Sequence, residues 1–197
     1  MNILLICLIG YAIGNISNAY FIGKIFLNKD VRNFGSGNAG ATNALRAFGA
    51  KIGILVFALD ILKGVIAVLI GRYLDAETGQ YFAGLMVIIG HNWPAILKFK
   101  GGKGIATSIG AMLIINPIVS LVCFVIGISI AFFTRLVSLG SLIGVAIAPI
   151  IVIVFFRPVN SNFLIFTTIL SILAIFKHRS NILRLIKGKE NKLGKKD

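Results

Sequence analysis

The amino-acid sequence predicts an all-α integral membrane protein with seven transmembrane helices, two of them short, in one membrane-embedded domain over residues 1–197. The chain is 57% hydrophobic with a mean hydropathy of +0.95, more apolar surface than a soluble domain of this size can bury. Stretches such as 52–71 and 139–156 approach the roughly 20 residues that span a hydrocarbon core. These stretches do not alternate with period 2, which favours helices over a barrel.

The distribution of basic residues orders the spans. No basic residue precedes Lys24, so we expect an uncleaved N-terminus outside the cell. Asn116-Pro117 should divide an apolar run too long for one span, because a proline ends or kinks a helix. The predicted spans cover residues 2–26, 52–71, 80–97, two short helices within 105–133, 139–156 and 162–176.

This count places 17 of the 20 Lys and Arg residues, together with the C-terminus, on the cytoplasmic side. The formal net charge of +14 is then a consequence of membrane topology. We therefore expect no nucleic-acid partner.

The first polar segment lies between the first two spans and reads G-S-G-N-A-G-A-T-N-A-L-R over residues 35–46. It matches the dinucleotide fingerprint G-x-G-x-x-G, but that motif requires a strand that a loop between membrane spans does not supply. Its glycines still let backbone N–H groups line a concavity, and a short helix should run from near residues 39–41 to Gly49. An ordinary polar loop with a capped helix is the alternative. The candidate phosphate ligands are Gly35, Ser36, Gly37, Asn38, Thr42, Asn43 and Arg46.

The second polar segment reads K-F-K-G-G-K-G-I-A-T over residues 98–107. Gly104 follows Lys103 where a Walker A loop needs Ser or Thr, so the segment is no such loop. A flexible basic loop beside anionic headgroups is the alternative. Two glycine loops on one face nevertheless favour two phosphate groups. The candidate ligands here are Gly101, Gly102, Lys103, Gly104 and Thr107.

The third polar segment begins K-H-R-S-N at residue 177. His178 and Asn181 are spaced i, i+3, and a histidine accepts a proton near neutral pH. A juxtamembrane helix that binds anionic lipid is the alternative. We expect Ser138 at the edge of the same pocket.

Asp60 and Lys63 lie within the second span at i, i+3. Ionisable residues inside a membrane are functional candidates, although a neutralised structural pair is at least as good an interpretation. Two histidines without paired carboxylates do not form a metal site, and we expect no cofactor.

These residues leave three classes of protein open. The first is a membrane enzyme for phosphorylated substrates, the second a transporter for a small anion, and the third a lipid-binding scaffold. A transporter should carry polar residues near the midplane and two repeated halves, whereas the polar residues here gather at one face.

At these segments the chain resembles the acyl-phosphate-dependent glycerol-3-phosphate acyltransferases of bacteria, the PlsY family. The likeness covers nearly the whole chain, and besides the three segments it includes L-D-I-L-K-G at 59–64, G-H-N-W-P at 90–94 and V-S-L at 137–139. The chain departs from the family at residues 15–18, where a usual Ser-Ile-Pro is absent, and at Lys177, where Arg is usual.

The resemblance implies seven membrane helices in the bacterial inner membrane, with the active site at the cytoplasmic face. It implies transfer of an acyl chain from acyl phosphate to the sn-1 hydroxyl of glycerol 3-phosphate, the first acylation step of phospholipid synthesis. Expected partners are these two substrates, membrane lipids and an enzyme that produces acyl phosphate. The chain also lacks the H-x-x-x-x-D motif of thioester-using acyltransferases. The expected catalytic residues are Ser36, Arg46, Lys103, His178 and Asn181.

Overall fold

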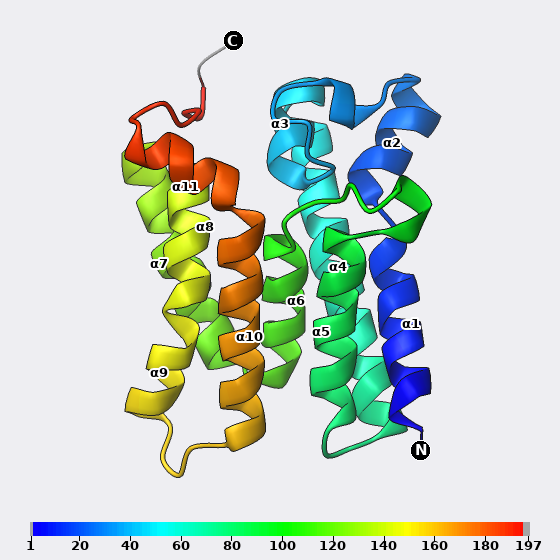
Figure 1. Ribbon diagram of the computed structural model, residues 1–197, viewed down its shortest axis with the longest axis vertical. Helices are drawn as coiled ribbons and strands as arrows, with labels where there is room; N and C mark the ends of the chain where they lie inside the picture. Colours follow the sequence, from blue (N-terminus) through cyan, green and yellow to red (C-terminus); the bar gives the residue numbers. More distant parts are fainter. Residues whose placement is uncertain (1, 195–197) are drawn as a thin grey trace. The chain divides into compact units, whose positions relative to one another are not determined.

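The computed structural model describes residues 2–194, and within this range every regular element is a helix, which confirms the predicted all-α class. The chain divides into two compact units, Met1–Ile115 and Asn116–Asp197 (Figure 1). A single domain over the whole chain therefore stays a prediction.

The first unit consists of one long helix, five shorter helices and two 3-10 turns in the range that the structure describes (Figure 1). Its elements are α1 (Ile3–Asn15), α2 (Asn18–Leu27), η1 (Val31–Asn33), α3 (Ala41–Phe48), α4 (Ala50–Leu74), α5 (Gly79–Asn92), η2 (Ala95–Leu97) and α6 (Ile105–Ile115).

Small residues let the helices of this unit approach closely. α1 packs along α5, where a Cβ on Gly14 would overlap the Val87 carbonyl and one on Gly90 would overlap the Tyr11 carbonyl. α4 packs on α6 in the same way, because a side chain at Gly64 would overlap the Thr107 carbonyl. Small residues at helix contacts are typical of proteins whose solvent is lipid.

The second unit has five helices in the range that the structure describes (Figure 1). They are α7 (Pro117–Thr134), α8 (Val137–Ala146), α9 (Ala148–Phe155), α10 (Ser161–Lys177) and α11 (Arg179–Ile186). α8 packs against α7 and α10, and α9 packs against α10.

The predicted break at Asn116-Pro117 is confirmed. Asn116 caps α7 by accepting a hydrogen bond from the Val119 N–H, and Pro117 occupies the first turn, where its missing N–H costs nothing. Three further breaks were not predicted from the sequence. The predicted span over residues 2–26 is divided at Ile16 and Ser17 into α1 and α2. α5 ends at Asn92 rather than continuing to residue 97, because Trp93 precedes Pro94 and is disfavoured in the helical region. Pro149 accompanies the division between α8 and α9.

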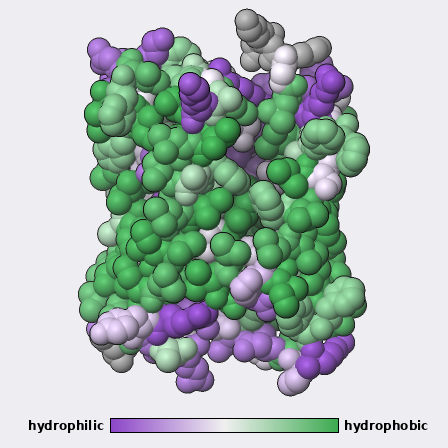
Figure 2. Space-filling view, turned by 180° about the vertical axis from the view of Figure 1, so that it is seen from behind, coloured by the Kyte–Doolittle hydropathy of each residue, from purple (hydrophilic) through white to green (hydrophobic). Residues whose placement is uncertain are grey.

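Four helical segments among the described residues are long and apolar enough to cross a membrane, and a fifth is counted if the bent pair α10 and α11 is one span. The four are Ile3–Leu27, Ala50–Leu74, Pro117–Thr134 and Val137–Phe155. Apolar side chains cover the middle of the face seen in Figure 2, and hydrophilic ones gather toward its two ends. The exact number of spans and the outside position of the N-terminus stay predictions.

Candidate active site

The first glycine loop, residues 34–40, is held from beneath by one amide side chain. Asn43, buried in the first turn of α3, accepts a hydrogen bond from the Ser36 N–H at 2.9 Å. Its Nδ2 donates to the carbonyls of Val31 and Phe34, each at 2.9 Å. Because its amide is engaged in this way, Asn43 shapes the loop rather than presenting a free group to a ligand.

The loop then presents polar groups above α3, which begins at Ala41 as predicted. Asn38 Nδ2 lies 3.2 Å from Ser36 Oγ and can donate to it. Gly35 has φ +50°, and a Cβ there would stand 2.6 Å from Asn43 Oδ1 and 4.0 Å from Arg46 Cδ. The Arg46 side chain therefore lies beside the loop, one turn along the helix from Asn43.

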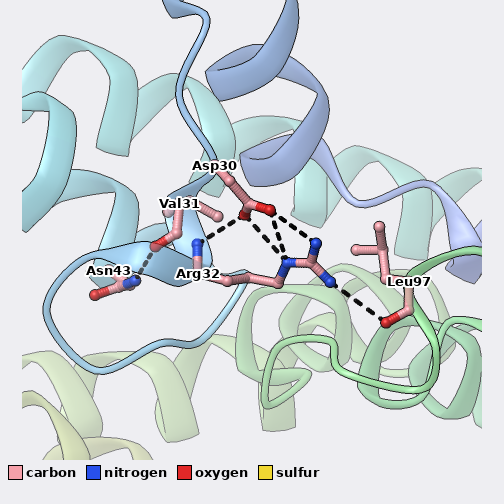
Figure 3. A network of polar contacts seen from close by, with 5 residues as sticks. All are labelled: Asp30, Val31, Arg32, Asn43 and Leu97. Carbon is pink, nitrogen blue, oxygen red and sulfur yellow. Dashed lines mark hydrogen bonds and ion pairs between the residues drawn. The ribbon is translucent and has the colours of Figure 1, made fainter.

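Arg32 ties this loop to the segment that leads into the second one (Figure 3). Its guanidinium lies 2.8 Å from the Asp30 carboxylate and donates to the Leu97 carbonyl at 3.4 Å. The side-chain hydrogen bond from Arg32 is the main reason why the pKa of the Asp30 carboxyl is below its usual value, against the opposing effect of partial burial. Arg32 also lies over the Tyr20 ring, 4.9 Å from its centroid.

The second glycine loop, residues 98–104, is shaped by close backbone packing against the end of α5. The Gly102 N–H donates to the His91 carbonyl at 3.1 Å. A side chain at Gly101 would overlap that same carbonyl, and one at Gly102 would overlap His91 Nε2. Gly104 has φ +79° and leads directly into α6, so the predicted loop before a helix N-terminus is confirmed.

The two glycine loops lie side by side within the first unit. A Cβ added to Gly40 would stand 3.9 Å from the Cα of Gly102. Each loop precedes a helix N-terminus, where backbone N–H groups favour an anion, and each brings a half-buried cation, Arg46 or Lys103. The arrangement offers two adjoining places for anionic oxygen atoms.

Thr107, a candidate ligand in the sequence analysis, does not line these places for anionic oxygen atoms. It is fully buried in the first turn of α6, with its backbone against Gly64 of α4. Its hydroxyl has no hydrogen-bond partner among the described residues. We therefore treat Thr107 as a packing residue and not as a ligand.

In the second unit, His178 stands at the bend between α10 and α11, whose axes differ by 63°. It is 2% exposed, and its Nδ1 lies 2.8 Å from the Ala174 carbonyl. A carbonyl oxygen can only accept, so Nδ1 carries the proton and Nε2 is the basic nitrogen of the neutral ring. The hydrogen bond to the Ala174 carbonyl of α10 therefore fixes the tautomer.

Asn181 and Arg184 are joined through Glu190, a residue to which the sequence analysis gave no role. Asn181 Nδ2 donates to Glu190 Oε1 at 2.7 Å, and Arg184 Nε lies 2.8 Å from Glu190 Oε2. Burial raises the pKa of the Glu190 carboxyl, but hydrogen bonds from Asn181 and Arg184 outweigh it, so the pKa falls below its usual value. A single carboxylate nine residues from Asn181 carries no motif, and only the folded tail reveals the contact.

Ser138 lies close enough to that carboxylate to affect its pKa, although its buried hydroxyl makes no hydrogen bond of standard geometry among the described residues. Ser138 therefore lies beside the carboxylate that holds Asn181, and its place at the edge of a substrate pocket stays a prediction. No group of three or more possible metal ligands occurs in the described part of the chain.

Comparisons with known proteins identify the class to which this fold and these loops belong. The family model described as "Glycerol-3-phosphate acyltransferase" matches residues 4–188. The chain is 51% identical over 196 residues to a glycerol-3-phosphate acyltransferase of Thermoanaerobacter sp. (strain X514), covering 100% of this chain and 98% of that relative. It is 43% identical to one from Clostridioides difficile (strain 630), covering 98% and 96%.

Comparison with solved structures supports the same family. The crystal structure of PlsY (YgiH), an integral membrane glycerol 3-phosphate acyltransferase, in its glycerol 3-phosphate form superposes with a TM-score of 0.90 at 38% identity, covering 98% of this chain and 96% of that one. The lysophosphatidic acid form gives 0.87 at 36%, covering 98% and 95%.

The fold is therefore that of an integral membrane acyltransferase. The chain belongs to the glycerol-3-phosphate acyltransferase family, and the resemblance seen in its motifs is confirmed. Its activity is the acylation of glycerol 3-phosphate, which serves phospholipid synthesis.

Proposed function

We propose that the acyl donor is an acyl phosphate and that the acceptor is the sn-1 hydroxyl of glycerol 3-phosphate. The products are then 1-acyl-glycerol 3-phosphate, which is lysophosphatidic acid, and inorganic phosphate. The observation that carries the proposal is the pair of adjoining glycine loops, each with its own cation. Both proposed substrates carry a phosphate group, whereas a thioester donor would present none beside its reacting carbon. The relatives crystallised in glycerol 3-phosphate and lysophosphatidic acid forms support this choice of acceptor and product.

The chemistry requires no acyl-enzyme intermediate. An acyl phosphate is a mixed anhydride with a good leaving group. The acceptor oxygen bonds to the acyl carbon, the bond from that carbon to the phosphate oxygen breaks, and the hydroxyl proton passes to a base. The protein must hold two anions together, cancel their repulsion and align the hydroxyl.

We assign the electrostatic work to Arg46 and Lys103. The planar guanidinium of Arg46 suits the oxygen atoms of a phosphate, and Lys103 supplies a compact charge at the end of its glycine loop. The Ser36 hydroxyl and the N–H groups of Gly35, Gly101 and Gly104 add neutral donors, with Asn38 and Thr42 beside them. The N–H groups of Gly37 and Gly102 donate to the carbonyls of Phe34 and His91, so these two glycines shape the phosphate sites instead.

His178 and Asn181 are proposed to act on the acceptor hydroxyl. Nε2 of His178 is the nitrogen able to accept its proton, since Nδ1 is held by Ala174. Asn181, held by Glu190, would orient the hydroxyl. Transfer of the proton to a substrate phosphate is the alternative, in which His178 only binds.

We place the reaction at the cytoplasmic face of the bacterial inner membrane, with the acyl tail among the helices and lipid. The partner enzyme would then be one that produces acyl phosphate. The concentration of basic residues in the loops and in the C-terminal segment supports this orientation.

The donor is tested with purified protein in detergent, glycerol 3-phosphate, and either palmitoyl phosphate or palmitoyl-CoA. We expect product and stoichiometric phosphate only with the acyl phosphate, and no acyl group on the protein after rapid quenching. Comparable rates with the thioester, or an acyl group trapped on Ser36, would reject the proposal.

The proton acceptor is tested with His178→Gln. If His178 is the base, kcat falls by about 10²–10⁴ and the acidic limb of the rate profile disappears. If it only binds, KM for glycerol 3-phosphate rises while kcat keeps its pH dependence. An unchanged kcat and KM would remove His178 from the reaction.

A further inference from the structure

A buried polar network lies beneath the second glycine loop and is not used by the proposed chemistry. Lys63 Nζ lies 3.2 Å from Asp60 Oδ1 on the same helix, α4, which confirms the pair suggested by the sequence. The same Nζ lies 2.8 Å from Nδ1 of His91 on α5. Asn18 of α2 donates to Asp60 Oδ1 at 2.9 Å. Asp60, Lys63 and His91 are 1%, 6% and 5% exposed.

Lys63 also contacts backbone carbonyls at the break between α1 and α2. Its ammonium donates to the Ile16 carbonyl at 2.8 Å, and the Gly14 carbonyl lies 3.3 Å from the same nitrogen. The helix is interrupted at Ile16 and Ser17, so carbonyls near its end lose their usual partners one turn further on. A cation at a helix C-terminus also opposes the negative end of the helix dipole.

The hydrogen-bond chemistry of Lys63 fixes the tautomer of His91. An ammonium group only donates, so Nδ1 of His91 accepts and the ring proton sits on Nε2. The imidazole is thereby held in one orientation by α4.

The other side of that imidazole meets the glycine loop. A side chain at Gly102 would overlap Nε2, and the His91 backbone carbonyl accepts the Gly102 N–H. Lys103, the proposed phosphate ligand, is the next residue. A contiguous chain of contacts therefore runs from the interrupted first helix through Lys63 and His91 to the loop.

We propose that Asp60, Lys63 and His91 are positioning residues that set the conformation of residues 101–104 and hence the place of Lys103. The inference rests on the proposed function for the role of Lys103. The network acts through the loop and touches no substrate. A purely structural role explains it less well, because a buried ion pair is often replaced by apolar residues without loss of stability.

Two substitutions at His91 separate the contribution of the acceptor at Nδ1 from that of the side chain's bulk. His91→Asn keeps an acceptor close to the position of Nδ1, whereas His91→Leu keeps bulk and removes the acceptor. Val87→Ala is the matched control, since Val87 is fully buried one turn earlier on α5 and has no part in the network. Thermal unfolding and the kinetics for both substrates are measured for each variant in detergent.

We expect His91→Leu to lower kcat/KM by about 100-fold, the effect of displacing a binding group by about an ångström. His91→Asn should recover most of that loss, and Val87→Ala should lose stability but keep its kinetic constants. In a Lys103→Ala background, His91→Leu should have little further effect, because residues 101–104 then carry no charge to place.

Kinetic constants of folded His91→Leu that match those of Val87→Ala would overturn the inference, as would full additivity with Lys103→Ala. If His91→Leu does not fold, His91→Gln decides, since its longer side chain moves the acceptor; unchanged kcat/KM there has the same consequence. The assays use whichever acyl donor the unsubstituted protein accepts. Rejection of acyl phosphate as donor would therefore leave this test intact.

Discussion

The two glycine loops adjoin one another but are built by opposite means. Side chains shape the first: Asn43 holds three backbone groups in place, and Arg32 links the loop to Leu97. The absence of side chains shapes the second, where Gly101 and Gly102 lie directly against His91. Substitutions should therefore damage the first loop by removing atoms and the second by adding them.

Removal of the two cations should give the largest effects. Lys103→Ala and Arg46→Lys should each slow turnover by roughly 100-fold or more, the former through lost charge and the latter through lost fork geometry. Steady-state kinetics of folded variants provide the measurement. Lys100→Ala is the control and should stay within a few-fold of the unsubstituted enzyme, because Lys100 precedes the glycines and is exposed. Near-normal turnover by Lys103→Ala would return its loop to the alternative of a basic turn that faces lipid headgroups.

Alanine at glycine positions tests the comparison directly. Gly102→Ala should abolish most activity, because its Cβ has no space beside His91 and the loop must move by about an ångström, which is worth roughly 100-fold. Gly37→Ala should cost much less. The nearest atom to its Cβ is the Arg32 carbonyl oxygen at 3.5 Å, and only the strain of φ +71°, about 1–2 kcal/mol, opposes it. Equal losses of activity in the two variants would contradict the comparison.

Loss of the Asn43 side chain should loosen the first loop and, to a lesser degree, lower the stability of the whole fold. Asn43→Ala removes three hydrogen bonds, each worth about 1 kcal/mol net, so unfolding should become easier by roughly 2–3 kcal/mol. Asn43→Asp keeps the acceptor for Ser36 but sets a carboxylate against two carbonyls, so it should be no better. Thermal unfolding and KM report the two effects. A stable Asn43→Asp with normal KM would mean that the amide donors do not hold the loop.

The smallest effect should come from the Asp30–Arg32 pair. Because the folded-state pKa of Asp30 is depressed, its stabilisation is present above the unfolded-state pKa near 4 and disappears as pH falls through the folded-state pKa. Asp30→Asn should thus reduce stability at pH 7 by about 1 kcal/mol or less, and the difference should shrink at acidic pH. Thermal unfolding at pH 7 and pH 3 measures it, and a difference that grows on acidification would reverse the assigned sign.

The sequence predicted the all-helical class, the break at Pro117 and the helix after each glycine loop, because apolar runs, proline and glycine act locally. It did not predict the end of α5 at Asn92 or the division of the 139–156 run into two helices. There a proline competes with a continuous apolar pattern, and packing decides which prevails.

The candidate site divides in the same way. Glycines and cations predicted the two loops. Other features depend on which residues become neighbours in three dimensions: the hydrogen bonds of Asn43, the burial of Thr107 and the contact between Asn181 and Glu190. His91 is another example, since a histidine in G-H-N-W-P gives no sign that its ring packs on Gly102, eleven residues further along the chain.

The i, i+3 spacing of Asp60 and Lys63 has a consequence for biogenesis. Both charges lie on α4, so they can pair within a single helical turn as that helix enters the bilayer, before α1 or α5 has docked. Pairing at that stage lowers the cost of burying either charge in lipid. Moving one partner to a neighbouring helix would preserve the folded contact, yet it would leave a lone charge during insertion, with failure at the translocon rather than in the finished enzyme.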